Sequence, residues 1–195
     1  MKTVYYPNIL KKILMSKWTR EETIVAFNVY CKIPFKNSSK THPMIIKYAK
    51  LLGRSSSALN MKIGNIGRLD PNLKEQGITG LIHGAKMEEE VWKEFYDNPE
   101  RLAFESEKII AKLSNQSIEE SVAISMDNLP KGIERAVVIR QRVNQSFFRS
   151  AVMSAYNFKC CISGISAPQL VEACHIVDWS EYPNHRTNPK NGLCM

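Results

Sequence analysis

The side chains best suited to chemistry lie in the last third of the chain, around a single histidine. His175 falls in the segment 170–177 (LVEACHIV), which reads as a strand. Alternate side chains of a strand face opposite ways, so Ala173 and His175 share one face. A neutral imidazole can take a proton from water near pH 7, so His175 could serve as a general base. The alternative is a histidine with a structural role only.

Cysteines are the other reactive side chains. The chain has five, at positions 31, 160, 161, 174 and 194. An odd number at this low density does not fit a disulfide scaffold. A structural zinc site needs a pair spaced like CxxC, and the adjacent Cys160 and Cys161 are poorly placed to chelate one ion. We therefore expect reduced, partly buried thiols.

An ordered series of residues surrounds His175. It comprises Arg142-Val-Asn-Gln145, Phe148-Arg149, Tyr156, Cys160-Cys-Ile-Ser-Gly164, Glu172-Ala-Cys-His175-Ile176, Trp179, Arg186 and Asn191-Gly-Leu193. This series resembles the HNH endonuclease family, most closely the subgroup found at the C-terminus of restriction endonucleases. The resemblance covers residues 133–195 and rests on several separate anchors in the same order.

The resemblance implies a ββα-metal fold that hydrolyses DNA phosphodiester bonds with a divalent cation. The cation could be Mg, Mn, Ni or Zn, and its ligands are unknown. By this resemblance His175 is the general base, and the Asn191 amide ties the following loop to the histidine strand. Arg186 could meet a phosphate with its bidentate fork. Arg142 and Arg149 either bind phosphate or have a structural role.

Two residues depart from the family pattern. Cys174 stands where many members have an Asp or His that ligates the metal, and a thiol is a poor ligand for a hard cation such as Mg²⁺. Asp178 stands where the subgroup usually has proline; a carboxylate there could bind the metal or have no role, and we favour no role.

The family's last helix, which carries the final histidine, would follow Asn191-Gly-Leu193, whereas the chain ends at Met195. We therefore expect an incomplete domain with little or no nuclease activity, and whether it binds the metal is left open. Either the sequence is a fragment or the product is naturally short. The alternative function is a non-catalytic DNA-binding protein with a degenerate HNH remnant.

The N-terminal third reads as three short helices. Thr19 to Glu22 fits a capping box, Pro43 suits a helix start, and Ser55 can cap a third helix after Gly53. A tight turn between the second and third helices suggests a helix-turn-helix. The stretch 18–58 also resembles Myb/SANT-like tri-helical modules.

If the helix-turn-helix interpretation holds, the third helix presents its polar residues to DNA. Arg54, Ser56, Asn60 and Lys62 would then face outward, with Arg and Lys on phosphate or guanine and Asn60 on adenine. The alternative is a helical unit that binds protein and has a solvated polar face.

The middle of the chain predicts helices at 87–96 and 102–113. The polar segment 114–132 contains Pro130 and Gly132 and suggests a linker. We therefore expect a helical domain over 1–113, a linker over 114–132 and the HNH domain over 133–195. The fold class is α+β and mostly helical, with an acidic helical connector.

Charge is distributed unevenly along the 195 residues. Residues 1–70 hold 13 Lys and Arg against 3 Asp and Glu, residues 71–130 hold 6 against 12, and residues 131–195 hold 8 against 4. Basic ends attract polyanions, which favours DNA as partner. No apolar run is long enough for a membrane helix and no secretory signal is evident, so we expect a cytoplasmic protein without a membrane partner. A homodimer is left open.

Overall fold

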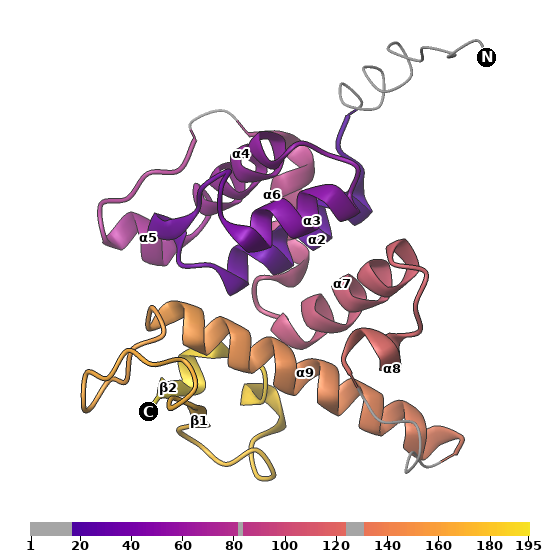
Figure 1. Cartoon of the computed structure of the whole chain (residues 1–195), viewed down its shortest axis with the longest axis vertical. Coiled ribbons are helices and arrows are strands. Elements are labelled where there is room, and N and C mark those ends of the chain that lie inside the picture. The colour runs from indigo at the N-terminus through magenta and orange to yellow at the C-terminus, as the bar shows by residue number, and fades with distance from the viewer. Residues whose placement is uncertain (1–16, 82–83, 124–130) are drawn as a thin grey trace, which may run out of the picture.

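The computed structural model describes residues 17–81, 84–123 and 131–195. The chain is mostly helical, with one small two-stranded sheet near the C-terminus, which confirms the α+β class (Figure 1). All five cysteines are unpaired, as expected. No helix of the described residues is long and apolar enough to cross a membrane.

Three helices form the N-terminal unit, as the sequence predicts. They are α2 (Arg20–Lys32), α3 (Pro43–Leu51) and α4 (Ser56–Gly67). The capping box at Thr19 is present, because the Thr19 hydroxyl accepts from the Glu22 amide and the Glu22 carboxylate accepts from the Thr19 amide. Gly53 has φ +64°, a left-handed conformation that lets the chain turn sharply between α3 and α4.

Four further helices surround this unit. They are α5 (Pro71–Glu75), α6 (Lys86–Phe95), α7 (Pro99–Leu113) and α8 (Ile118–Ser121). Helix α2 is the central element and packs against α4, α6, α7 and α9. Helix α8 lies inside the predicted linker 114–132, where Ser117 supplies a capping box that the sequence analysis overlooked.

Helix α9 (Ile133–Ala155) joins the two parts of the molecule. Val143, Phe147 and Ala151 belong to the core that α2 and α7 build. Phe148 and Val152, on the adjoining face, belong to a second cluster with residues of the C-terminal segment. The division into domains at 114–132 stays a prediction, but the packing of α9 places residues from both sides of that segment in one core.

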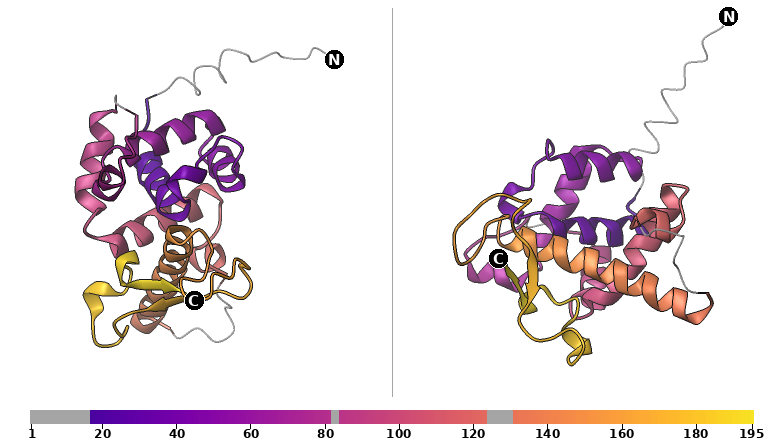
Figure 2. Two further views of the ribbon diagram at one scale, coloured as in Figure 1. Left: turned by 90° about the vertical axis from the view of Figure 1, so that its left-hand side faces the viewer. Right: turned by 60° about the horizontal axis from the view of Figure 1, so that its bottom comes forward.

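The sheet consists of β1 (Ala173–His175) and β2 (Gly192–Cys194), paired antiparallel with His175 opposite Gly192. It packs on α9 so closely that a Cβ at Gly192 would lie 2.3 Å from a methyl carbon of Val152. Strand β1 is shorter than the predicted strand 170–177. At its start, Leu170 lies in a turn instead, where its backbone amide donates a hydrogen bond to the Ala167 carbonyl. The hairpin lies beside α9, at the opposite end of the molecule from α4 (Figure 1, Figure 2).

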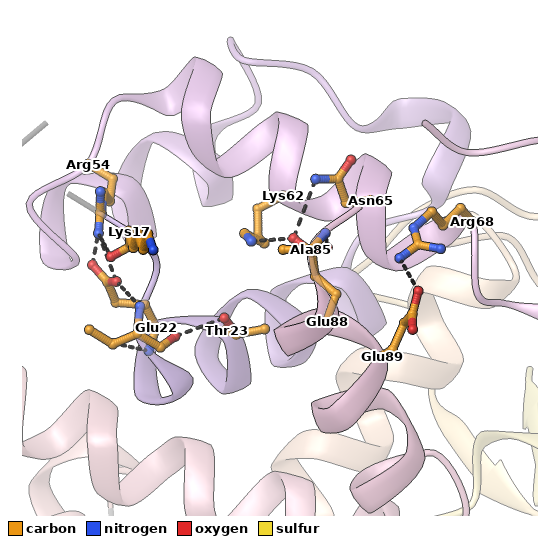
Figure 3. A network of polar contacts seen from close by, with 11 residues as sticks. Lys17, Glu22, Thr23, Arg54, Lys62, Asn65, Arg68, Ala85, Glu88 and Glu89 are labelled. Carbon is orange, nitrogen blue, oxygen red and sulfur yellow. Dashed lines mark hydrogen bonds and ion pairs between the residues drawn. The ribbon is translucent and has the colours of Figure 1, made fainter. Parts of the chain in front are cut away.

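The expected outward orientation of Arg54 is wrong. Its side chain is buried and holds Glu22 through two hydrogen bonds of 2.8 and 2.9 Å, while also donating to the Lys17 carbonyl (Figure 3). Although burial opposes ionisation, the hydrogen bond from Arg54 lowers the pKa of Glu22 from its ordinary value of 4.5. The turn before α4 is short, so Arg54 reaches back to the capping box of α2 instead of pointing to solvent.

Lys62 was also expected to face outward, and this is wrong as well. Its ammonium is buried and paired with the Glu88 carboxylate of α6, which also accepts hydrogen bonds from the Ala85 amide and the Asn65 side chain (Figure 3). Helix α6 covers this side of α4. A buried lysine needs such a partner, because an unpaired charge is costly away from water.

The Lys62–Glu88 pair yields a stability prediction. We expect Glu88→Ala to lower the free energy of unfolding by about 3–5 kcal/mol, because it leaves a buried ammonium unpaired. The double variant Lys62→Met/Glu88→Leu removes both charges and should recover most of that loss. Urea unfolding at pH 7 measures both. A double variant no more stable than Glu88→Ala would contradict this account.

Candidate active site

The hairpin and α9 together position the ring of His175. The ring is half-buried and stacks on Phe148 of α9, with centroids 3.8 Å apart and planes 7° from parallel. Trp179 meets it edge-on at 5.3 Å. The histidine is therefore clamped between an α9 side chain and the loop that follows β1, with part of its surface open to solvent.

One hydrogen bond determines which nitrogen of His175 carries the proton. Nε2 lies 2.9 Å from the backbone carbonyl oxygen of Arg186. A carbonyl can only accept, so Nε2 must donate, and in the neutral ring Nδ1 then carries the lone pair. Among the described residues Nδ1 makes no hydrogen bond. The site thus presents a half-buried imidazole whose basic nitrogen is free to take a proton.

Asn191 ties the loop to the histidine strand. Its side-chain oxygen accepts from the Val177 amide at 2.9 Å, and its amide nitrogen donates to the carbonyls of Val177 and His185 at 3.3 and 3.2 Å. Its own carbonyl accepts from the Ile176 amide. The side chain is buried, so these bonds replace most of its contact with water. Asn191 therefore holds both ends of the loop that carries Arg186.

The Arg186 side chain holds the same loop through contacts with Trp179 and Ser180. Its Nε donates to the Trp179 carbonyl at 2.6 Å, one terminal nitrogen lies 3.4 Å from the Ser180 carbonyl, and its guanidinium lies 5.4 Å from the centre of the Trp179 ring. These contacts use Nε and one terminal nitrogen of the guanidinium and leave its other N–H donors available. Arg186 is therefore positioned beside His175 through both its backbone and its side chain.

Asp178 adds a negative charge near the ring. Hydrogen bonds from the hydroxyl and the amide of Ser180 lower the pKa of Asp178 from its ordinary value of 3.8, and the charge of His175 adds to the effect. The side chain is an exposed carboxylate at neutral pH. It would stabilise an imidazolium at His175.

The predicted phosphate-binding arginines of α9 differ from each other. Arg149 is ion-paired with Glu172 and donates to the Val171 carbonyl at 3.3 Å, so it braces the chain that leads into β1. Arg142 is exposed and has one side-chain bond, to Gln145 at 3.1 Å. Of the two, Arg142 is the less engaged.

The predicted DNA-contacting residues of the N-terminal unit are not brought together with His175. Arg54 and Lys62 are buried in ion pairs, and half-buried Asn60 accepts a hydrogen bond from Ser38 at 2.7 Å. Helix α4 lies at the opposite end of the molecule from the hairpin (Figure 1).

The described side chains do not form a metal centre by themselves. Across residues 17–81, 84–123 and 131–195, no three His, Cys, Asp or Glu side chains converge in a way that could hold an ion. Asp178 lies near His175, and Cys174 is half-buried on the neighbouring position of β1. A thiol suits soft cations and not Mg²⁺. The cation that the resemblance implies therefore stays a proposal.

Two contributions to the site were missed from sequence. Phe148 and Trp179 were named only as members of the series that carries the resemblance, with no role at the site, whereas both contact the His175 ring. Residue type and spacing do not reveal which side chain Phe148 meets. The Arg186 carbonyl was missed too, since backbone groups leave no signal in residue types.

Comparison with known proteins agrees with this geometry. The family described as HNH endonuclease matches residues 160–195, which include β1, the loop and β2. This match confirms the resemblance to the HNH endonuclease family over residues 160–195. No curated protein and no solved structure matches the chain. The matched family suggests a nuclease, which is a hydrolase.

Asn191 gives the prediction for this site. We expect Asn191→Ala to lower the free energy of unfolding by about 2–3 kcal/mol, because it leaves backbone groups of Val177 and His185 without partners. Hydrogen exchange at the Val177 amide should accelerate more than at the amides of α9. The exposed Asn184→Ala is the control, with a change below about 0.5 kcal/mol. Unchanged exchange at Val177 would contradict the clamp.

Proposed function

We propose that this chain is a DNA endonuclease of the restriction-type HNH subgroup, with His175 as general base. The observation that carries the proposal is the hydrogen bond from His175 Nε2 to the Arg186 carbonyl, which leaves Nδ1 basic. The family match over 160–195 supports the reaction class. DNA as substrate and a divalent cation as cofactor follow from that class.

The reaction places one proton on His175. A water oxygen attacks phosphorus, its proton passes to Nδ1, the bond between phosphorus and the leaving oxygen breaks, and that oxygen takes a proton from solvent water. The ring becomes an imidazolium, which the Arg186 carbonyl stabilises because it accepts from Nε2. The Asp178 carboxylate stabilises the same charge. These groups would be fixed before the substrate arrives, so they need no reorganisation during the step.

Three arginines would meet the phosphodiester. Arg186 lies beside the ring and keeps donors free, Arg142 is exposed on α9, and Arg149 reaches the chain entering β1. Asn191 acts as a positioning residue, because it fixes the loop that carries Arg186. Activity in the presence of Mg²⁺, Mn²⁺, Ni²⁺ and Zn²⁺ would identify the cation.

Plasmid nicking tests the proposal. Supercoiled DNA is incubated with protein in excess and each cation in turn, so that even a slow reaction is recorded. Any nicking by the parent chain should fall about 100-fold or more in His175→Ala, since that is the usual contribution of a general base. The exposed His185→Ala serves as the matched control and should retain the rate.

The competing function is DNA binding without cleavage. It predicts salt-sensitive complexes in gel shifts without metal, and no nicks with any of the four cations. That result would overturn the nuclease proposal. Nicking that survives in His175→Ala would overturn the role of the histidine.

A further inference from the structure

A cavity lies between the helical unit, which comprises helices α2 to α8, and the nuclease segment, which comprises residues 156–195, and the proposed reaction does not use it. Its volume is about 740 Å³, within the range of small-ligand sites. The helical unit contributes residues of α2, α5 and α6, and the nuclease segment contributes residues of η3 (Pro189–Asn191) and β2. Gly192, the strand partner of His175, is among them. The cavity therefore reaches the hairpin that carries His175, the proposed general base.

One wall of the cavity is a stack of aromatic rings. Trp92 is stacked with Phe27 at 4.9 Å and with Tyr96 at 4.7 Å, so the stack runs from the buried Phe27 to the half-buried Tyr96. Tyr30 stands edge-on to Trp92, at 6.2 Å, and Tyr156 of the nuclease part lines the cavity as well. A flat ring could extend this stack by lying on Tyr96.

Polar groups line the cavity between these rings. Asn72, Asn157 and Asn188 carry amides, which have both donors and acceptors, as the edges of nucleobases do. Asp70 also lines the cavity, but its carboxylate is already engaged by the Tyr30 hydroxyl at 2.5 Å and by Asn72. The Asn72 nitrogen is engaged by Asp70 and the Asn188 oxygen by the Lys190 amide at 3.0 Å, so the Asn72 oxygen, the Asn188 nitrogen and the Asn157 amide are the groups left for a ligand edge.

Two lysines line the cavity from opposite parts of the molecule. Lys36 comes from the helical unit and Lys190 from η3, and both are exposed. Lys190 directly precedes Asn191, so a phosphate at this lysine would lie on the chain segment that positions the proposed active site. Stacking surface, amide edges and cations are the three features with which proteins hold one nucleotide of a single strand.

We propose that this cavity binds a single nucleobase displaced from the DNA strand, stacked on Tyr96, with its phosphate near Lys36 and Lys190. The choice of DNA as the source rests on the proposed nuclease function. Displacing a base from a duplex costs the energy of unpairing and unstacking, and contacts to the displaced base repay it. The cavity would thus contribute to the choice of substrate at a distance from His175, the proposed general base.

Binding of 2′-deoxynucleoside 5′-monophosphates tests the cavity directly. The four monophosphates are titrated into the 195-residue chain without metal, followed by calorimetry. We expect saturable binding of at least one, weakened about tenfold or more in Tyr96→Leu, which removes the ring. Tyr96→Phe keeps the ring and should bind within twofold of the parent chain. Equal binding by the Leu and Phe variants, or no binding at all, would overturn the proposal.

Competition identifies the source of the base. A single-stranded 8-mer should displace the bound monophosphate, whereas failure to compete would mean that the cavity takes a free nucleotide, contrary to the proposal. A cross-link from an 8-mer with 5-iodo-2′-deoxyuridine should map to Tyr96, Tyr30 or Tyr156. This readout does not depend on the fold of a variant, and cross-links only outside the cavity would overturn the proposal.

The two proposals fail in different ways. Monophosphate binding needs neither metal nor cleavage, so His175→Ala should retain it. Nicking that depends on His175 in a chain that binds no monophosphate would overturn only the proposal that the cavity binds a nucleobase. Binding that depends on the Tyr96 ring in a chain that never nicks DNA would support the cavity and overturn the nuclease function.

Discussion

The proposed active site depends on one backbone carbonyl, that of Arg186, which accepts a hydrogen bond from Nε2 of His175. A histidine is useful as a base only when one nitrogen is held and the other is free. The carbonyl can hold the ring because the loop 176–191 is closed by Asn191, which bonds to Val177 and His185 from a buried position. The stack on Phe148 then fixes the plane of the ring.

Helix α9 extends this constraint to the whole molecule. Phe147 packs into the helical core and Phe148, the next residue, packs under the histidine. Because both rings leave the same rigid helix, the orientation of the hairpin relative to the helical unit is coupled to the core. The cavity between the two parts owes its shape to the same helix, which contributes Phe147, Ala151 and Ser154 to its lining.

Elements with strong local signals could be predicted from the sequence. The capping box at Thr19, the turn at Gly53 and the strand that carries His175 all follow from residue type and spacing. The exposure of Arg54 and Lys62 could not be predicted in this way. Both have acidic partners on other helices, and sequence alone does not reveal that Glu22 and Glu88 would bury them. At the site, residue types indicated His175 and Asn191, whereas the Arg186 carbonyl and the Phe148 stack depend on tertiary packing.

The tautomer of His175 is the most direct test of the central claim. Long-range ¹H–¹⁵N correlation spectra of the ring, recorded on the full chain at a pH at which the ring is neutral, distinguish the two neutral forms. The account predicts a protonated Nε2 and an unprotonated Nδ1. A ring protonated at Nδ1 would mean that Nε2 does not donate to the Arg186 carbonyl, and it would contradict the account.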